Sequence, residues 1–435
     1  MRGQLRYQVF VLLAAACLAP IAKSELRIDI TEGAGQAVPI AIVPFGWEGS
    51  GAPPVDLSAV VAGDLTRTGR FAPIAEKDML EFPTAGTEVD FGDWRILGIE
   101  VVIVGRLSES GPDSYIIQFQ LFDVFRDELL LGYRLPSTGA ALRASAHRVS
   151  DLIYEKLTGV PGVAGTRIAY VNVLGKSDAE IFRLIVSDAD GENARVMLES
   201  ADPILSPAWS PDGRKLAYVS FERGNSEVYV QVLRTGARQR VSARRGVNSA
   251  PAWSPDGRSL ALTLSKTDGN LDIYTHNLSN RVLRRLTDNP SIDTEASWSA
   301  DGRWIFFTSD RSGGPQIYKI SGNGGRARRQ TFEGNYNARP RVSPNDQNIA
   351  VVHNDRGSYR IAVFDVARAY LQVLTNGHLD ESPSFAPNGE TLIYATREGG
   401  RGLLAAVSID GRIRQRISSV DGDVREPAWS PFPVN

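Results

Sequence analysis

The chain of 435 residues is nearly without cysteine and poor in histidine. Its single cysteine, Cys17, lies in an apolar N-terminal run, so the rest of the chain offers no thiol, no disulfide and no cysteine ligand for a metal. The four histidines are far apart and form no His-Glu-x-x-His pair, so we expect ordinary packing or surface roles for His147, His276, His353 and His378. These absences predict no metal and no cofactor.

Long apolar runs are also lacking, apart from Val9–Ala19. That run follows two arginines, is too short to span a membrane and has the form of a secretory signal peptide. Small residues at Ala22 and Ser24 predict cleavage after residue 24. Lipoprotein processing at Cys17 is the competing interpretation, but three alanines precede that cysteine where a leucine-led sequence is expected. The sequence therefore predicts a signal peptide at residues 1–24 and a periplasmic chain that does not itself span a membrane.

An excess of positive charge is missing as well. The net charge is −2, and removal of residues 1–24 would change it to −5, because that segment holds three basic residues and no acidic one. Such a balance argues against nucleic acid as a partner. A chain of this length exceeds a single hydrophobic core, so we expect two or more domains.

A seven-residue pattern of the form Pro-Ala-Trp-Ser-Pro-Asp-Gly occurs six times in the last two thirds of the chain. The residues at its third position follow one another at steps of 44, 45, 44, 43 and 44, which is the length of a propeller blade. Ser-Pro-Asp-Gly suits a type I turn, so each copy is predicted to be a hairpin between two strands. The third-position residues are Trp209, Trp253, Trp298, Val342, Phe385 and Trp429.

Each period holds four strand-like segments, but the two ends of the repeat are incomplete. A strand of the second type, Arg167–Val171, precedes the first motif, and the last motif, Pro427–Pro431, has no strand after it. We therefore predict a six-bladed propeller over residues 167–435, in which the C-terminal strand completes a blade begun by residues 167–200. Such closure removes open strand edges.

Residues 25–160 lack the repeat and read as a small α/β domain, joined to the propeller by a linker at 161–166. Asp56 is suited to cap a helix that ends near Gly69, and a second helix begins at about Ala140 with apolar residues near the helical period. Strands are predicted at residues 38–44, 99–107, 114–124 and 128–135. The fold class is thus an α/β domain followed by an all-β propeller.

Motifs of common enzymes are missing too. There is no Gly-x-Ser-x-Gly element, and Gly175–Ser177 lacks the earlier glycine of a phosphate-binding loop, because Tyr170 stands there. The acidic segment Asp188–Asn193 lacks the glycine and glutamate spacing of a calcium loop, so we predict a hairpin turn. These findings favour a protein without catalytic residues that binds other proteins. The alternative is an extracytoplasmic propeller enzyme acting on a sugar or peptide in the central channel.

The export signal, the α/β domain, the six motifs and the ending at Pro427–Pro431 together resemble the TolB family of the Tol-Pal envelope system. Val342, Phe385 and Asp346 depart from the motif as ordinary variation between blades. The resemblance implies a periplasmic adaptor that supports outer-membrane integrity and envelope constriction during cell division. It also implies two partners, the outer-membrane lipoprotein Pal at the propeller mouth and TolA at the N-terminal segment, with other envelope proteins as further candidates.

Two sets of residues are the candidate partner-binding sites. The loops that lead into the inner strands ring one mouth of the channel and carry polar residues of both signs, which suits hydrogen-bonded recognition. The N-terminal segment 25–36 alternates apolar and polar residues like a strand, and either forms the first strand of the α/β domain or acts as an arm that binds TolA. The mouth set is Asn248, Ser249, Ala250, Asp293, Thr294, Glu295, Asn337, Arg339, Asp380, Glu381, Arg425 and Glu426, and the arm set is Glu25, Leu26, Arg27, Ile28, Asp29, Ile30 and Thr31.

Overall fold

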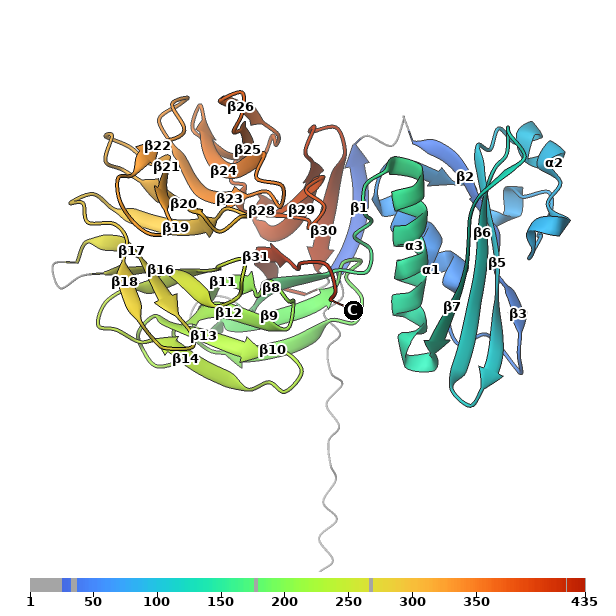
Figure 1. Cartoon of the computed structure of the whole chain (residues 1–435), viewed down its shortest axis with the longest axis horizontal. Coiled ribbons are helices and arrows are strands. Elements are labelled where there is room, and N and C mark those ends of the chain that lie inside the picture. The colour runs from blue at the N-terminus through green and yellow to red at the C-terminus, as the bar shows by residue number, and fades with distance from the viewer. Residues whose placement is uncertain (1–25, 33–36, 176–178, 266–268, 420, 435) are drawn as a thin grey trace, which may run out of the picture.

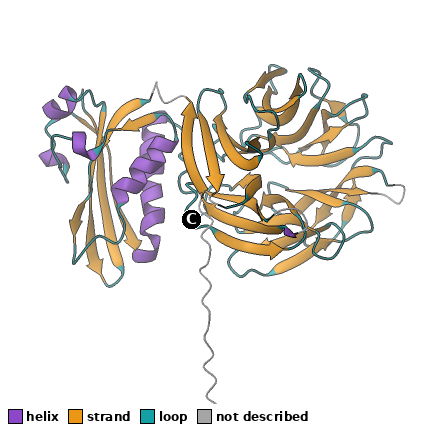
Figure 2. Ribbon diagram, turned by 180° about the vertical axis from the view of Figure 1, so that it is seen from behind, coloured by secondary structure: helices purple, strands orange, loops and turns teal. Residues whose placement is uncertain are grey.

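A computed structural model of the protein describes residues 26–32, 37–175, 179–265, 269–419 and 421–434. The predicted signal peptide and Glu25 lie outside the described residues. The described chain forms two bodies, a small α/β domain and a six-bladed β-propeller, which lie side by side (Figure 1). The predicted fold class is confirmed. Helices are concentrated in the α/β domain, whereas the propeller is built of strands (Figure 2).

The α/β domain is a six-stranded sheet of order β4-β2-β5-β6-β7, with β3 paired to β5. β2 runs parallel to β4 and β5, while β5, β6 and β7 are antiparallel to one another. Its strands are β2 (Val38–Ile42), β3 (Gly46–Glu48), β4 (Phe71–Pro73), β5 (Val101–Gly111), β6 (Ser114–Asp123) and β7 (Glu128–Thr138). Its helices are α1 (Leu57–Arg67), α2 (Phe91–Ile96) and α3 (Leu142–Thr158), with short 3₁₀ turns η2 (Glu76–Asp78), η3 (Gly86–Glu88) and η4 (Gly139–Ala141).

Helices α1 and α3 pack together on the side of the sheet that faces the propeller (Figure 1). Asp56 caps α1 as predicted, because its side chain accepts a hydrogen bond from the amide of Ala59 at 2.9 Å. Gly159 ends α3 in the left-handed conformation, with φ of 75°. The buried face of α1 carries Leu57, Val61 and Leu65, but it also carries a buried aspartate, Asp64, which a hydrophobic pattern does not predict.

The propeller has six sheets of four main strands around a channel. Blade 1 comprises β8 (Arg167–Leu174), β9 (Ile181–Asp188), β10 (Arg195–Ser200) and β31 (Asp423–Trp429); blade 2 comprises β11 (Ile204–Trp209), β12 (Lys215–Ser220), β13 (Glu227–Val232) and β14 (Arg238–Ser242). Blade 3 comprises β15 (Asn248–Trp253), β16 (Ser259–Ser265), β17 (Leu271–Asn277) and β18 (Leu283–Arg285); blade 4 comprises β19 (Asp293–Trp298), β20 (Trp304–Ser309), β21 (Gln316–Ser321) and β22 (Arg328–Arg329). Blade 5 comprises β23 (Asn337–Val342), β24 (Asn348–Asp355), β25 (Ser358–Asp365) and β26 (Tyr370–Val373); blade 6 comprises β27 (Glu381–Phe385), β28 (Thr391–Glu398), β29 (Arg401–Ser408) and β30 (Arg414–Ser419).

The repeated motif joins neighbouring blades as well as neighbouring strands. Trp253 Nε1 donates a hydrogen bond to the Ala208 carbonyl of the preceding blade at 3.1 Å, and Trp209 and Trp298 make the equivalent bonds. In the turn after β11, Gly213 has φ of 65° and lies against Pro431 of blade 1, so a side chain at this position would be strained. These three bonds join blades 1 to 4 along the inner ring.

Strand β1 (Leu26–Glu32) does not belong to the α/β sheet. It pairs antiparallel with β30 and adds a fifth strand to the outer edge of blade 6, with Leu26 opposite Ser419 and Ile28 opposite Ile417. The interpretation of this segment as the first strand of the α/β domain is therefore wrong. It is an arm that lies on its own propeller, next to the boundary between the two bodies (Figure 1).

Candidate functional site

The mouth of the channel is shaped by a β-bulge in the inner strand of every blade. The pairing of each inner strand with its neighbour shifts register at the same place, just after the strand begins. One residue per bulge takes a left-handed conformation with φ between 48° and 55°. These six residues are Ser206, Ala250, Glu295, Arg339, Ser382 and Glu426.

Four members of this bulge ring, Ala250, Glu295, Arg339 and Glu426, are predicted mouth residues, and three of them form a charge network in the channel. Arg339 Nε donates to Glu295 Oε1 at 2.7 Å, and its Nη1 lies 3.6 Å from Glu426 Oε1 and donates to Ser382. Burial by itself lowers the pKa of Arg339, but the nearby carboxylates of Glu426 and Glu295 outweigh it and raise the pKa. The guanidinium is therefore held charged between blades.

Four other predicted mouth residues are buried within the protein. Asn248, Asp293, Asn337 and Asp380 occupy equivalent places at the start of the inner strands, and each is at most 1% exposed. Their side chains are taken up by bonds within the protein: Asn248, for example, accepts from Ser242 Oγ at 2.6 Å. Burial and satisfied hydrogen bonds give these four residues the role of fixing the mouth loops, and their contact with a partner stays a prediction.

Asp293 shows how firmly such a residue is held. Both of its carboxylate oxygens accept from Arg311 Nη2 at 2.7 Å. Arg311 in turn donates from Nε to Ser309 Oγ at 2.8 Å and lies over the rings of Phe307 and Tyr318, 5.5 and 4.9 Å from their centroids. This buried ion pair ties the start of β19 to the loop between β20 and β21.

The remaining predicted mouth residues, Ser249, Thr294, Glu381 and Arg425, are half-buried beside the bulges. Sequence reasoning missed exposed apolar residues that lie beside these positions. Val247, Ile292 and Leu379 directly precede the buried Asn or Asp and are 38%, 47% and 38% exposed. The sequence does contain a signal for them, an apolar residue repeated at blade spacing. The prediction of the site selected the neighbouring polar residues instead. We call Val247, Ile292 and Leu379 the apolar rim.

The opposite end of the channel is a separate hollow of about 470 Å³. The Pro-Ala-Trp segments and their turns line it, together with Arg341 and Phe432. Burial lowers the pKa of Arg341. The predicted site residues Ala250 and Glu426 also line this hollow, so the bulge ring borders it.

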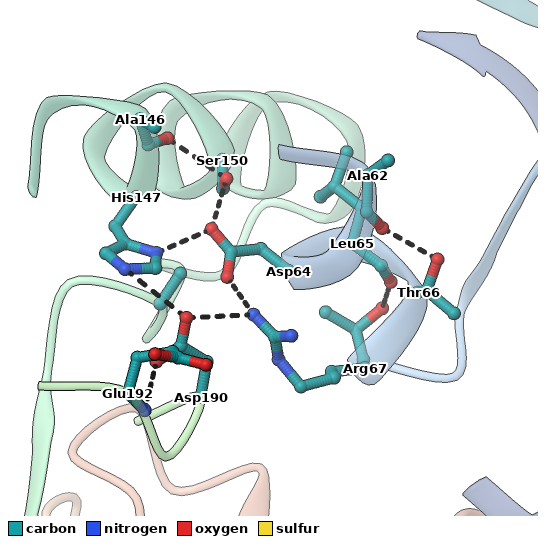
Figure 3. Close-up of polar contacts among 12 residues, drawn as sticks. Ala62, Asp64, Leu65, Thr66, Arg67, Ala146, His147, Ser150, Asp190 and Glu192 are labelled. Atoms are coloured by element: carbon teal, nitrogen blue, oxygen red, sulfur yellow. Dashed lines mark hydrogen bonds and ion pairs between the residues drawn. The ribbon is translucent and has the colours of Figure 1, made fainter. Parts of the chain in front are cut away.

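Another polar cluster joins the two domains (Figure 3). The interdomain cluster consists of Asp64 and Arg67 from α1, Arg143 and His147 from α3, and Asp190 from the turn between β9 and β10. Arg67 pairs with Asp64, and Arg143 pairs with Asp190. His147 Nδ1 lies 2.7 Å from Asp64 Oδ2, and its Nε2 lies 3.6 Å from Asp190 Oδ2. The expectation that His147 is an ordinary packing residue is wrong, because it stands between carboxylates of different domains.

This cluster has the oxygen and nitrogen atoms of a metal site but not its charge. Atoms of Asp64, His147 and Asp190 that could ligate a metal lie within 4.8 Å of one another. The guanidiniums of Arg67 and Arg143 already pair with both carboxylates, and a divalent cation would be repelled by them. The arrangement fits an ion-pair cluster better than a metal centre.

The fold and these surfaces define a class of protein: a small α/β domain followed by a propeller with a shaped mouth, and an arm laid along one blade. Comparison with known proteins identifies the family. Residues 26–130 match the TolB amino-terminal domain and residues 154–433 match the TolB beta propeller domain. The chain belongs to the TolB family.

Individual relatives agree. The chain is 51% identical to the Tol-Pal system protein TolB of Xanthomonas oryzae pv. oryzae over 99% of both chains, and 50% identical to that of Xanthomonas campestris pv. campestris with the same coverage. The crystal structure of TolB from Acinetobacter baumannii superimposes with a TM-score of 0.87 at 42% identity and covers 94% of this chain and 100% of that one.

These relatives are named as components of the Tol-Pal system rather than as enzymes, which supports the prediction of a non-catalytic protein over the propeller-enzyme alternative. Among the described residues, the helices are too short or too polar to cross a membrane.

Proposed function

We propose that this protein is a periplasmic adaptor that binds a Pal-like lipoprotein at the propeller mouth and TolA through its arm. The observation that carries the proposal is the separation of two binding surfaces with different chemistry. The mouth is a preformed surface with an apolar rim around polar groups, whereas the arm is a single strand added to a sheet edge.

The mouth has the composition of a protein-binding surface. Covering the exposed apolar side chains with a partner removes them from water, which favours binding. The bulge ring behind them supplies fixed hydrogen-bonding groups. The backbone of the apolar rim is held in place, since Val247 exchanges bonds with Ser265 and Ile292 exchanges bonds with Asp310. Such rigid presentation lowers the entropic cost of binding.

The arm suits a partner that takes up a strand. It makes its backbone bonds with one neighbour, β30, and Thr31 adds a bond to the Arg414 carbonyl at 3.2 Å. A strand at the edge of a sheet can exchange one sheet for another with little change in its own conformation. Binding of TolA by residues 25–31 would then compete with docking on the propeller.

A pair of matched substitutions tests the mouth. We expect Val247→Asp to weaken binding of purified Pal at least tenfold, because it places a charge in the apolar rim. Val282→Asp is the control, since Val282 is 57% exposed on an outer turn of the same blade. Calorimetric affinities that are equal for both variants would place the lipoprotein elsewhere.

Deletion of residues 25–33 tests the arm. We expect the shortened protein to lose TolA binding while its propeller stays folded and binds Pal with unchanged affinity. Val247→Asp should show the reverse pattern, with TolA binding kept. Full TolA affinity after the deletion would remove the arm from the proposal.

A further inference from the structure

The interdomain cluster and the arm share one structural element, the turn between β9 and β10. Asp190 of this turn reaches into the cluster, and the next residue, Gly191, packs on Leu26 of the arm. Gly191 has φ of 91°, and a Cβ there would come within 2.6 Å of Leu26. Leu26 is buried, so the turn forms part of the seat of the arm.

His147 is the member of the cluster whose charge can change near neutral pH. It is 2% exposed. Because a carboxylate only accepts, His147 Nδ1 must donate to Asp64 Oδ2. Its Nε2 has no hydrogen-bond partner among the described residues, and it points at Asp190 Oδ2 from 3.6 Å. In a neutral ring, the lone pair of Nε2 would face the Asp190 carboxylate and be repelled by it. In a protonated ring, Nε2 would attract this carboxylate and so hold the propeller turn against α3.

Among the described residues, charged groups from three elements surround His147. Asp64 and Arg67 come from α1, Arg143 and Asp151 from α3 itself, and Asp190 from the propeller turn. The charges of Asp64 and Asp190 cancel those of the two arginines. Burial raises the pKa of Asp151 to about 6, so above that pH its carboxylate leaves the group one positive charge short, which protonated His147 supplies.

We propose that the interdomain cluster is a proton-operated latch, in which uptake of one proton by His147 holds the β9–β10 turn against α3 and thereby keeps the arm seated on the propeller. Loss of the proton loosens the turn and frees the arm. The latch acts on docking of the arm, whatever partner the arm binds.

The direction of the effect follows from the docked structure. Burial by itself lowers the pKa of His147, but the hydrogen bond to Asp64 and the charges of Asp64 and Asp190 raise it above its usual 6.5. Asp64 lies in the same domain as His147, so the part of this rise that docking adds comes from Asp190, and through that carboxylate docking takes up a proton. Docking is favoured at low pH. Its equilibrium constant falls as pH rises through the pKa of the docked state, by no more than tenfold for each pH unit.

The test follows a nitroxide spin label on the arm. A chain that begins at Glu25 has no cysteine, so Thr31→Cys gives a single exposed labelling site. We expect the immobilised fraction of the label to be highest at pH 5.5–6 and to fall several-fold by pH 8.5. His147→Gln should make the label mobility independent of pH, and His276→Gln, on the propeller strand β17, should leave the dependence unchanged.

Two glycines calibrate the signal. Gly191→Ala should free the arm at every pH, and Gly236→Ala, at a left-handed position with open space around it, should not. A label that is equally mobile at pH 6 and 8.5, or a pH dependence that persists in His147→Gln, would overturn the latch. If His147→Gln fails to fold, NMR titration of the four histidines decides: a His147 ring that titrates below 6.5 overturns the proposal, and one that titrates above 6.5 with the label release supports it.

Discussion

The buried ion pair of Asp293 and Arg311 allows a direct test of whether the residues at the start of the inner strands build the mouth or contact its partner. Asp293→Asn keeps the shape of the side chain and removes its charge. Asp293 is fully buried, and Arg311 then faces an amide with fewer acceptor sites. We expect the variant to lose stability rather than to lose affinity for a lipoprotein directly.

The size of the loss can be worked from the contacts. Removing one partner of a buried ion pair costs about 3–5 kcal/mol. Arg311 keeps its bond to Ser309 and its contacts with Phe307 and Tyr318, so the lower end, about 3 kcal/mol, applies here. For a propeller of this size each kcal/mol lowers the melting temperature by about 2 °C, so we expect a fall of roughly 6 °C.

Asp288→Asn is the matched control. Asp288 also pairs with an arginine, Arg285, but its side chain is 77% exposed, and we expect a change of less than about 1 kcal/mol. Melting curves of both variants, measured by circular dichroism, check the difference. Equal shifts would show that burial does not set the energy of the pair. A normal melting temperature with lost lipoprotein binding would mean that Asp293 faces the partner after all.

Three further predictions concern other contacts. A chain ending at residue 426 should lose cooperative melting at the full-length temperature, because it lacks the last three residues of β31 and the bond that the Arg167 amide donates to Ser430 Oγ. Trp253→Phe should lower the free energy of unfolding in urea by about 1–2 kcal/mol, since the Ala208 carbonyl loses its donor. Burial raises the pKa of Asp151 to about 6, so its contribution to stability is present at low pH and lost as pH rises through 6; between pH 5 and 8 the wild type should lose about 1.4 kcal/mol relative to Asp151→Asn.

The architecture could be predicted from the sequence because each of its parts leaves a local signal. The blade motif repeats at a fixed step, and its Ser-Pro-Asp-Gly turn is seen in the bond from the Gly213 amide to the Ser210 carbonyl at 2.8 Å. Asp56 and Gly159 likewise mark helix ends through their own conformations. Strands β3 and β4 and helix α2 were missed, since three to six residues are too few for a periodic pattern.

The site was only partly predictable, because burial depends on residues that are distant in the chain. Asn248 and Glu295 both look like polar loop residues in the sequence. Asn248 is buried under its own loop, whereas Glu295 enters the channel. The same limit hid the meeting of Asp64, His147 and Asp190, which come from two domains. Asp64 lies on the buried face of α1, where an apolar pattern predicts no charged residue.

Blade 1 is assembled from two pieces of chain that are separated by the other five blades, since β31 pairs with β8. A chain is synthesised from its N-terminus, so β8 is made early and has no inner neighbour until Asp423–Trp429 follows. During this interval the inner edge of β8 is open to pairing with strands of other molecules. The time between delivery of the first and last strands, rather than the stability of the finished ring, then determines how long the protein is exposed to misassembly.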